Sequence, residues 1–256
     1  MSFKHIISRD NSLFKQLKRI ADSSRERRKL GETLLDGAHL VEAYLEAFGE
    51  PKLLIIPEGE STAEVTYLTQ QLADIPTVMF PTLMFQELTP VASPTGILAL
   101  VKTPNIAAPD ELDFVLMLED IQDPGNLGSM LRTAAAAGVD AVYLSEGCTD
   151  AWSPKALRGG QGAQFVLPII ERADLVEFAH AFEGQVLATT LNGKFIYTVD
   201  MTLPTAIAIG NEGNGLSEAL QEAATYQVTI PIAGVESLNA AAATSICLFE
   251  RVRQKL

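Results

Sequence analysis

Residues 114–132 read FVLMLEDIQDPGNLGSMLR, and this stretch decides the fold class of the second half of the chain. Its first five residues are all apolar, which is typical of a strand buried on both faces of a parallel sheet. A Pro-Gly turn and a helical pattern of small residues follow, ending at Gly138. A buried strand, a tight loop and a helix in succession are the repeating unit of an α/β fold.

The same unit recurs toward the C-terminus. Most of the further apolar segments are separated by helical patterns, which predicts a largely parallel sheet covered by helices on both faces. A long helix is expected from Leu238 to about Lys255, with Ser237 as its N-cap. The expected strands in this region are 141–144, 165–170, 186–191, 206–209 and 227–232.

The first half of the chain predicts a smaller α/β domain. Leu13, Leu17 and Ile20 have helical spacing, so one helix is expected from residue 12 to about 30, stopped by Gly31. The polar segment 102–113 (KTPNIAAPDELD) is a natural linker, and we therefore expect domains at 1–103 and 110–256. Between helix and linker we expect strands at 33–36, 52–56, 77–80 and 96–101, and helices at 38–48, 64–73 and after Thr82.

Composition narrows the class of protein. With 256 residues, 47% of them hydrophobic and 20% charged, the chain is long and apolar enough to bury a core, which excludes a disordered or fibrous protein. No apolar run reaches the length of a membrane helix and the N-terminus lacks a signal-peptide pattern, so a cytoplasmic protein without membrane contact is expected. Cys148 and Cys247 form no cluster with histidines, so neither a disulfide nor a metal site is expected.

Charge is divided unevenly along the chain. The net charge of −13 argues against a polyanionic partner, because Lys and Arg supply most of the affinity for phosphates. Residues 1–31 nevertheless carry a net charge of +6, and the rest of the chain carries −19. The N-terminal segment is therefore a candidate RNA contact, with a solvated helix face as the alternative. Its nine basic residues are Lys4, Arg9, Lys15, Lys18, Arg19, Arg25, Arg27, Arg28 and Lys29.

Ligands of parallel sheets bind beyond the carboxyl ends of the strands, so the loops there are where a site is expected. In the first such loop, Pro124 and Gly125 form a tight turn that presents Asn126 at the start of a helix, and Arg132 lies under two turns further on. Asn126 could instead cap the helix, and Arg132 could be a solvated side chain.

Two later loops carry further candidates. The loop 210–217 (GNEGNGLS) fits neither a Rossmann fingerprint nor a phosphate-binding loop, which argues against a nucleotide- or NAD-dependent enzyme. Its three glycines around Glu212 indicate that backbone approaches something closely, although a simple turn is the alternative. In the segment 230–239 (IPIAGVESLN), Ser237 and Asn239 stand at a helix N-terminus, where they could bind a ligand or only cap the helix.

Taken together, the three segments are much more specific than any one of them. The order N-x-G-x-x-x-R, G-N-E-G-x-G-L-S and I-P-x-x-x-x-E-S-L-N-A-A-x-A closely resembles the motifs of the SpoU (TrmH-type) RNA ribose 2′-O-methyltransferases of the SPOUT superfamily. This resemblance covers residues 110–256. Upstream, DGAHLVEAYLEA (36–47) and SPTGILALV (93–101) look like the substrate-binding domain of that family, which resembles ribosomal protein L30e.

The resemblance implies a trefoil-knotted α/β domain that binds S-adenosylmethionine in a pocket made by the knot, preceded by an L30e-like domain that binds RNA. It also implies a homodimer with helix 238–255 as contact, and no metal. The implied substrate is ribosomal RNA, because an L30e-like domain is present; transfer RNA and a non-catalytic RNA-binding protein are the alternatives. The implied catalytic residues are Asn126, Arg132, Glu212, Ser237 and Asn239, and the implied cofactor-binding residues are Gly210, Asn211, Gly213, Ile230 and Leu238.

One chemical restriction follows for the implied reaction. None of the three histidines, His5, His39 and His180, lies in a motif, so the usual general base is missing. A guanidinium stays protonated, and we therefore expect Arg132 to hold the target phosphate and lower the pKa of the hydroxyl rather than remove its proton. Asn126 and Asn239 would then orient the ribose.

Overall fold

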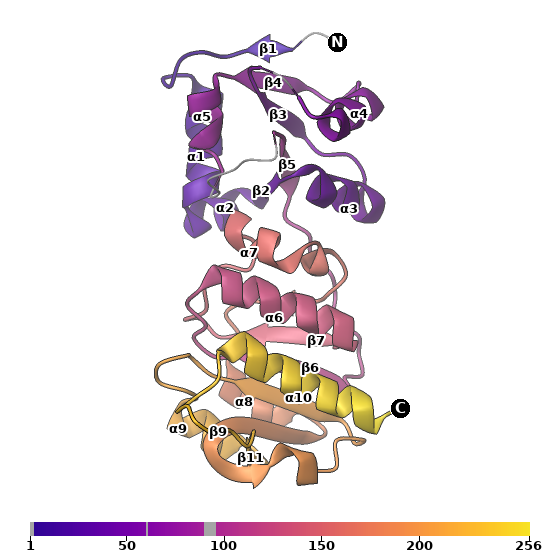
Figure 1. Ribbon diagram of the computed structural model, residues 1–256, viewed down its shortest axis with the longest axis vertical. Helices are drawn as coiled ribbons and strands as arrows, with labels where there is room; N and C mark the ends of the chain where they lie inside the picture. Colours follow the sequence, from indigo (N-terminus) through magenta and orange to yellow (C-terminus); the bar gives the residue numbers. More distant parts are fainter. Residues whose placement is uncertain (1–2, 60, 90–95) are drawn as a thin grey trace. The chain divides into compact units, whose positions relative to one another are not determined.

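The computed structural model describes residues 3–59, 61–89 and 96–256, and the chain forms two compact units (Figure 1). The first unit is Met1–Pro104 together with Trp152–Phe165, and the second is Asn105–Ala151 together with Val166–Leu256. Residues 93–95 of the SPTGILALV segment lie outside the described residues. None of the described helices is long and apolar enough to cross a membrane.

The sheet of the first unit is mixed. Its five strands have the order β1-β4-β3-β5-β2, with β5 antiparallel to both neighbours and the other pairs parallel. The four longer strands follow the expected segments to within two residues, because each is a short apolar run bounded by Gly, Pro or polar residues. Their bounds are β1 Lys4–His5, β2 Glu32–Asp36, β3 Leu53–Pro57, β4 Thr77–Phe80 and β5 Leu98–Lys102.

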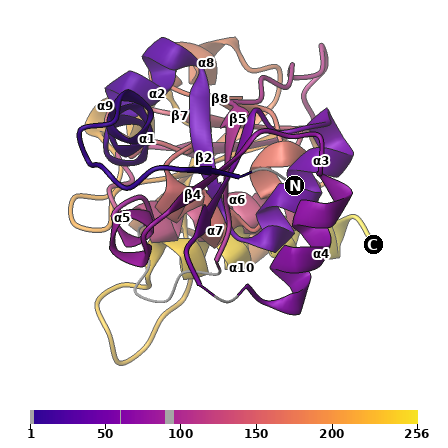
Figure 2. The same ribbon diagram turned by 90° about the horizontal axis from the view of Figure 1, so that it is seen from above.

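Helices cover both faces of this sheet (Figure 2). On one face, Phe14, Leu17 and Ile20 of α1 are buried against strand residues such as Ile55 and Phe80. The helices α3 and α4 lie on the other face and contact each other. The helices of the first unit are α1 Ser12–Asp22, α2 Ser24–Leu30, α3 Ala38–Phe48, α4 Ala63–Gln71, α5 Thr82–Gln86, α7 Pro154–Gly160 and the 3₁₀ turn η1 Ala163–Phe165.

The single helix expected over residues 12–30 is in fact two helices. Ser23 between them has extended backbone (φ −122°, ψ 114°), and its hydroxyl accepts a hydrogen bond from the Glu26 amide, which makes it the N-cap of α2. The expectation was wrong because the helix was extended past Ala21 although no apolar residue follows until Leu30. The local S-x-x-E sequence at 23–26, a capping-box pattern, was the signal that marks it.

The segment 152–165 packs with the first unit, although the sequence boundaries place it in the second domain. The hydroxyl of Thr33 on β2 donates to the Trp152 carbonyl (2.7 Å), and the rings of Tyr44 and Phe165 meet edge to face at 5.6 Å. Arg158 of α7 lies 3.8 Å from the buried carboxylate of Asp36. Composition changes at the linker 102–113 gave no sign of this, since the segment is remote in sequence from the strand that it covers.

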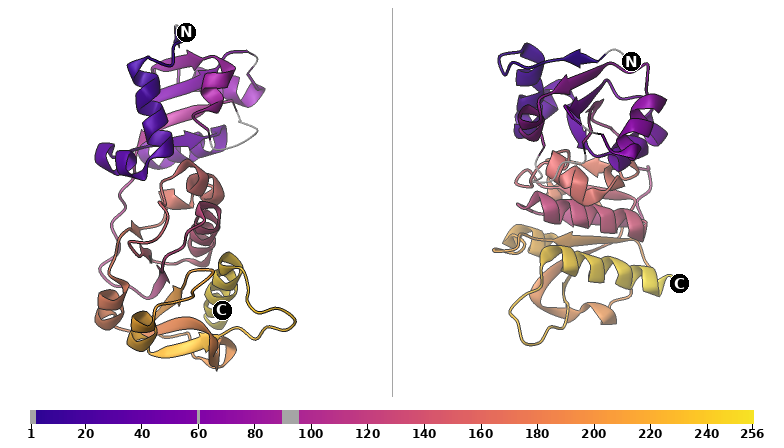
Figure 3. Two further views of the ribbon diagram at one scale, coloured as in Figure 1. Left: turned by 90° about the vertical axis from the view of Figure 1, so that its left-hand side faces the viewer. Right: turned by 45° about the horizontal axis from the view of Figure 1, so that its top comes forward.

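The second unit contains a fully parallel sheet of six strands in the order β11-β9-β10-β6-β7-β8. The helices α6 and α10 pack together on one face (Figure 3), and α8 and α9 cover the face that carries Val115, Ala188 and Ala206. The bounds are β6 Phe114–Leu118, α6 Pro124–Ala137, β7 Ala141–Leu144, β8 Ile169–Ile170, α8 Leu175–Ala181, β9 Gln185–Phe195, η2 Ile196–Thr198, β10 Thr205–Ile209, α9 Glu218–Ala223, β11 Tyr226–Thr229 and α10 Ala240–Gln254.

One expected strand of this unit is mostly absent. Residues 165–170 were expected to be extended, but only Ile169 and Ile170 pair, with Val142 and Tyr143 of β7. Pro168 removes a backbone donor, and Val166 is 69% exposed instead of buried. An apolar run containing a proline was therefore a weaker strand signal than its hydrophobicity indicated.

The end of α10 is tied to the start of β6 through Asp113. The Asp113 carboxylate accepts hydrogen bonds from Arg251 and Lys255, both at 2.7 Å, and the Arg251 guanidinium lies over the Phe114 ring at 4.2 Å from its centroid. The hydrogen bond from Lys255, opposed by partial burial and helped by Arg251, holds the pKa of Asp113 below its usual value. This cluster fixes the last turn of the chain on the sheet.

A pH-dependent contribution to stability follows. Because the folded-state pKa of Asp113 is lowered, its contribution is complete above the unfolded value of about 3.9 and disappears as pH falls through the folded value. We expect Asp113→Asn to lower the free energy of unfolding at pH 7 by less than about 1 kcal/mol, since the side chain is half exposed. Urea unfolding should show this difference at pH 7 and 5, and the difference should shrink as the pH falls below about 3.9. Asp110→Asn, which removes an exposed carboxylate without a described hydrogen bond, should show no such difference.

Candidate functional site

A cleft of about 630 Å³ opens in the second unit beside the middle of β9 and the ends of β10 and β11. Its walls come from these strands and from two loops, 210–217 and 230–239. Glu212 and Ser237 lie in the same walls. All five residues expected to bind a cofactor line this one cleft: Gly210, Asn211, Gly213, Ile230 and Leu238.

The loop 210–217 folds back on itself. Asn211 and Gly215 exchange backbone hydrogen bonds of 3.1 and 2.9 Å, and the Asn211 side chain accepts from the amides of Gly213 (2.8 Å) and Asn214 (3.1 Å). A Cβ atom at Gly210 would lie 2.2 Å from the Gly215 carbonyl carbon. A close backbone approach was expected at these glycines. At Gly210 it occurs within the loop itself, against the backbone of Gly215.

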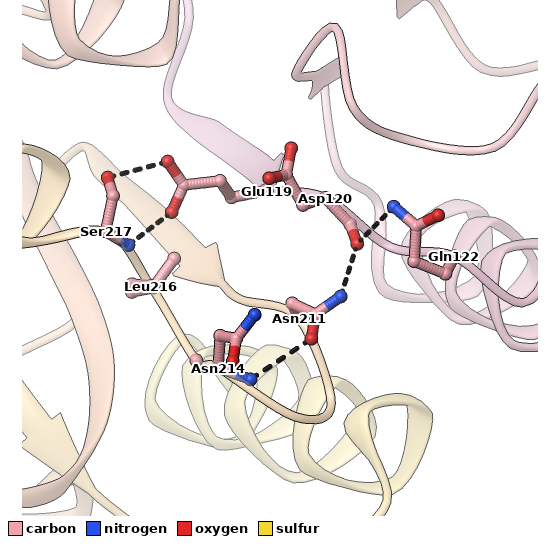
Figure 4. Close-up of a pocket in the computed structure, with 8 residues that line it drawn as sticks. Glu119, Asp120, Gln122, Asn211, Asn214, Leu216 and Ser217 are labelled. Atoms are coloured by element: carbon pink, nitrogen blue, oxygen red, sulfur yellow. Dashed lines mark hydrogen bonds between the residues drawn. The ribbon is translucent and has the colours of Figure 1, made fainter.

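The other side of this loop is held by the end of β6 (Figure 4). The Glu119 carboxylate accepts hydrogen bonds from the amide and the hydroxyl of Ser217, both at 2.7 Å. The Asn211 amide group donates to the Asp120 carbonyl at 2.8 Å. These residues, with Gln122, Asn214, Gly215 and Leu216, line a second, smaller pocket of about 400 Å³.

Three of the expected catalytic residues form one chain of hydrogen bonds. The Asn126 side-chain amide donates to Glu212 Oε1 at 2.8 Å, and the Asn239 side-chain amide donates to Asn126 Oδ1 at 3.2 Å. Asn126 stands on α6, Glu212 in the loop after β10, and Asn239 at the start of α10. Each of the three sequence motifs therefore supplies one member of the chain.

The capping expectations change at both helices. The N-cap of α6 is Asp123, whose carboxylate accepts from the Asn126 amide at 2.8 Å, so the alternative reading of Asn126 as a cap was wrong. The N-cap of α10 is Asn239, whose side chain accepts from Ala241 and Ala242, and not Ser237 as expected. A Ser two residues before an Asn carries the same sequence preference, and the geometry decides between them.

Arg132 and Ser237 are not part of the hydrogen-bonded chain. Both are exposed. Within the described residues the Arg132 side chain makes no hydrogen bond or ion pair. The charge of Arg132 is therefore available to a ligand. Ser237 is one of the residues that line the cleft.

Sequence reasoning missed the wall contributed by β9. Thr189, Thr190, Leu191 and Asn192 line the cleft, and the hydroxyl oxygen of Thr190 is fully buried without a hydrogen-bond partner among the described residues. These residues lie within β9, which continues to Phe195, so the strand-end argument used for the other loops does not point to them. Glu119, which holds Ser217, was also missed.

The tight contact inside the loop 210–217 predicts an unequal effect of two alanine substitutions. Gly210→Ala should lower the free energy of unfolding by about 1 to 3 kcal/mol, because backbone atoms must move to admit the new methyl group. Gly213→Ala is the matched control, since its Cβ would meet only the Asn211 side chain, at 3.3 Å. Denaturant unfolding measures both, and equal losses would contradict this account of the loop.

Comparisons with known proteins agree with this arrangement. Residues 113–249 match the SpoU rRNA Methylase family. RlmP of Bacillus subtilis strain 168, a 23S rRNA (guanosine(2553)-2′-O)-methyltransferase, is 33% identical over 256 residues that cover 96% of this chain and 98% of that protein.

Two solved structures are similar. The SpoU methyltransferase AviRb from Streptomyces viridochromogenes, in complex with AdoMet, superimposes with a TM-score of 0.83 at 28% identity over 96% of this chain and 98% of its own. The A. aeolicus TrmH/SpoU tRNA modifying enzyme gives a TM-score of 0.52 at 27% identity, over 58% of this chain and 78% of its own. Hydrogen bonds join its three motifs, residues 113–249 match the family model, and the chain is similar to RlmP and AviRb along nearly its whole length; it therefore belongs to the SpoU methylase family.

Proposed function

We propose that this protein transfers the methyl group of S-adenosylmethionine to a ribose 2′-hydroxyl of ribosomal RNA. The observation that carries the proposal is the hydrogen-bonded chain of Asn239, Asn126 and Glu212, formed beside a cleft that is lined by residues of the second and third motifs. Three segments that are far apart in sequence meet there in a member of the SpoU methylase family.

The cleft fits S-adenosylmethionine in size and in chemistry. A volume of about 630 Å³ is in the range of small-molecule sites. Ile209, Leu216 and Ile230 supply apolar wall, and the unsatisfied Thr190 hydroxyl needs a polar partner. The carboxylates of Glu212 and Glu236 offer negative charge to a sulfonium. The residues proposed to hold the cofactor are Gly210, Asn211, Gly213, Ile230 and Leu238.

The bound cofactor supplies an electrophilic methyl group, so the protein has to align the ribose and stabilise the developing alkoxide. We assign Arg132 to the phosphate of the target nucleotide, where its free positive charge also lowers the pKa of the nearby hydroxyl. Asn126 and Asn239 are assigned to orienting the ribose, and Ser237 to the substrate side of the cleft. No step in this assignment requires a metal.

Glu212 has two roles in this assignment. One carboxylate oxygen accepts a hydrogen bond from the Asn126 side-chain amide. This hydrogen bond fixes the orientation of the Asn126 side chain, and so the direction in which its oxygen points. The second oxygen has no hydrogen-bond partner among the described residues, and we assign it as the acceptor of the hydroxyl proton. In this assignment Glu212, whose carboxylate accepts from the Asn126 side chain, takes the place of the missing histidine.

The first unit supports ribosomal over transfer RNA. RlmP, named for 23S rRNA, is similar along both units, whereas the A. aeolicus tRNA modifying enzyme matches 58% of this chain. Because RlmP also has the first unit, we attribute this unit to a substrate that the two proteins have in common. We propose that this unit is the L30e-like RNA-binding domain.

The remaining features are proposed on the same basis. Similarity to AviRb along nearly the whole chain supports a trefoil knot in the second unit and a cytoplasmic enzyme. We propose a homodimer with α10 as contact, supported by Phe249, which is 46% exposed on that helix. An exposed aromatic side chain on a long helix is suited to burial against a second copy.

The proposed function is tested by transfer of labelled methyl from S-adenosylmethionine to total RNA from cells that lack this protein. A single new 2′-O-methyl site in ribosomal RNA, mapped by ribose-methylation sequencing, is the expected result. A site in transfer RNA would correct the substrate. Cofactor binding without labelling of any RNA, including assembly intermediates, would favour the non-catalytic RNA-binding alternative.

Removing the Arg132 charge should affect turnover and not cofactor binding. We expect Arg132→Ala to lower kcat/KM for RNA by at least about a hundredfold, because it removes the charge that stabilises the alkoxide. The Kd for S-adenosylmethionine, measured by calorimetry, should not change. A wild-type rate in this variant would show that Arg132 has no chemical role.

The buried hydroxyl of Thr190 should contribute to cofactor affinity. Thr190→Val keeps the shape and removes one hydrogen bond, so the Kd for S-adenosylmethionine should rise about 3- to 10-fold in calorimetry. Thr190→Ser retains the hydroxyl and should bind within about twofold of wild type. Unchanged affinity in the valine variant would mean that Thr190 faces water in the complex.

A further inference from the structure

Much of the basic charge of this chain is paired within the protein. Of its nineteen Lys and Arg residues, at least ten make an ion pair within the described part of the structure. In the segment 1–31, Arg9 pairs with Glu87, and Lys15 pairs with Asp10. Most of the basic charge that the sequence offers to RNA is therefore already neutralised by the protein.

The basic residues of the helix α1 are paired with acidic residues of the protein. Its Lys18 pairs with Asp22 at 3.0 Å and its Arg19 lies 3.9 Å from Glu26. Arg27 is buried at 5% exposure and donates to the carbonyls of Ile20 (2.6 Å) and Ala21 (2.9 Å), in the last turn of α1. Five of the nine N-terminal cations thus bind the protein itself, and Arg27 in addition fixes α2 against the end of α1.

The helix α2 is different. Arg25, Arg28 and Lys29 are all exposed, and none of them has an acidic partner among the residues that the structure describes. They occupy positions i, i+3 and i+4, which lie on one face of a helix. The only described contact of these three side chains is a 3.4 Å hydrogen bond from Arg28 to Ser24 on the same helix.

We propose that this face of α2, defined by Arg25, Arg28 and Lys29, is the surface on which the first unit holds the phosphate backbone of its RNA. The chain carries a net charge of −19 beyond residue 31, so three adjacent cations without acidic partners on one helix face are a local concentration of positive charge that can attract phosphates. Such a patch both binds phosphates and orients the RNA as it approaches. This inference rests on the proposed function, since RNA is its occupant.

The arrangement of α2 supports this use. The Ser23 cap and the buried Arg27 hold the helix at both its first turn and its middle, so the three cations are presented on a fixed element. Phosphate contacts of this kind position the nucleic acid without reading its sequence. Choice of the methylated nucleotide is therefore left to the second unit.

The test compares two triple variants with the same change in net charge. Arg25→Gln/Arg28→Gln/Lys29→Gln removes the free cations, and Lys15→Gln/Lys18→Gln/Arg19→Gln removes paired ones on α1. The probe is a ribosomal RNA fragment that the wild-type protein methylates. We expect the α2 variant to lose at least about tenfold in affinity at 0.15 M salt and its salt slope to fall by about 2 to 3. The α1 variant should stay within about threefold of wild type.

Three readouts separate the outcomes. Cofactor affinity by calorimetry and the thermal unfolding midpoint should match wild type in both variants, which shows that both are folded. At saturating RNA the α2 variant should keep the wild-type kcat with a raised KM. Equal losses in the two variants, or no loss in either, would overturn the α2 surface. If the α2 variant kept its affinity for RNA but lost binding to phosphatidylglycerol vesicles, the surface would be a lipid contact and the proposal would be overturned. If the wild-type protein labels no RNA, the proposed function fails instead.

Discussion

The hydrogen bond between Asn126 and Glu212 is the contact on which the site depends, because it joins loops that are 86 residues apart in sequence. It can form since β6 and β10 are neighbours in the sheet and run parallel, with Leu118 opposite Ile209 at their last residues. Both loops therefore begin side by side at one edge of the sheet. Glu119 and Asp120, at the very start of the first loop, bind Ser217 and Asn211 of the second. The residues that follow β6 and β10 thus form both the Asn126–Glu212 contact and the hydrogen bonds that hold the loop 210–217 in place.

Both units pair some of their cations and leave others without an acidic partner. In the second unit Arg251 and Lys255 pair with Asp113, and Arg253 pairs with Glu250, which holds the end of α10 in place. Arg132 makes no ion pair among the described residues. An acidic protein can bind a polyanion if the few cations that it leaves unpaired stand where the ligand must lie. Net charge describes solubility and long-range repulsion, and it does not locate contacts.

Much of the fold could be predicted from the sequence because apolar runs and helical spacing report burial directly. The strand β6 is apolar throughout and β10 is apolar after Thr205, and both were placed correctly to within one residue. The break at Ser23 was not predicted, because in a regular helix Arg27 and Arg28 would follow Leu17 and Ile20 on the buried face. Helical spacing takes no account of the free-energy cost of burying these two arginine side chains. The residues of the cleft were predicted from their motifs, whereas Thr190 was missed because its importance lies in a hydroxyl left without a partner by the packing.

The position of α7 bears on how the chain folds during its synthesis. Residues 152–165 complete the first unit by packing against β2 and the ring of Tyr44, although residues 105–151 between them belong to the other unit. A ribosome must therefore deliver the strands β6 and β7 of the second sheet before it delivers the segment that completes the first unit. Vectorial folding, in which an N-terminal domain matures alone while the rest is translated, is interrupted in this chain. The first unit can reach its final packing only after residue 165 has left the exit tunnel.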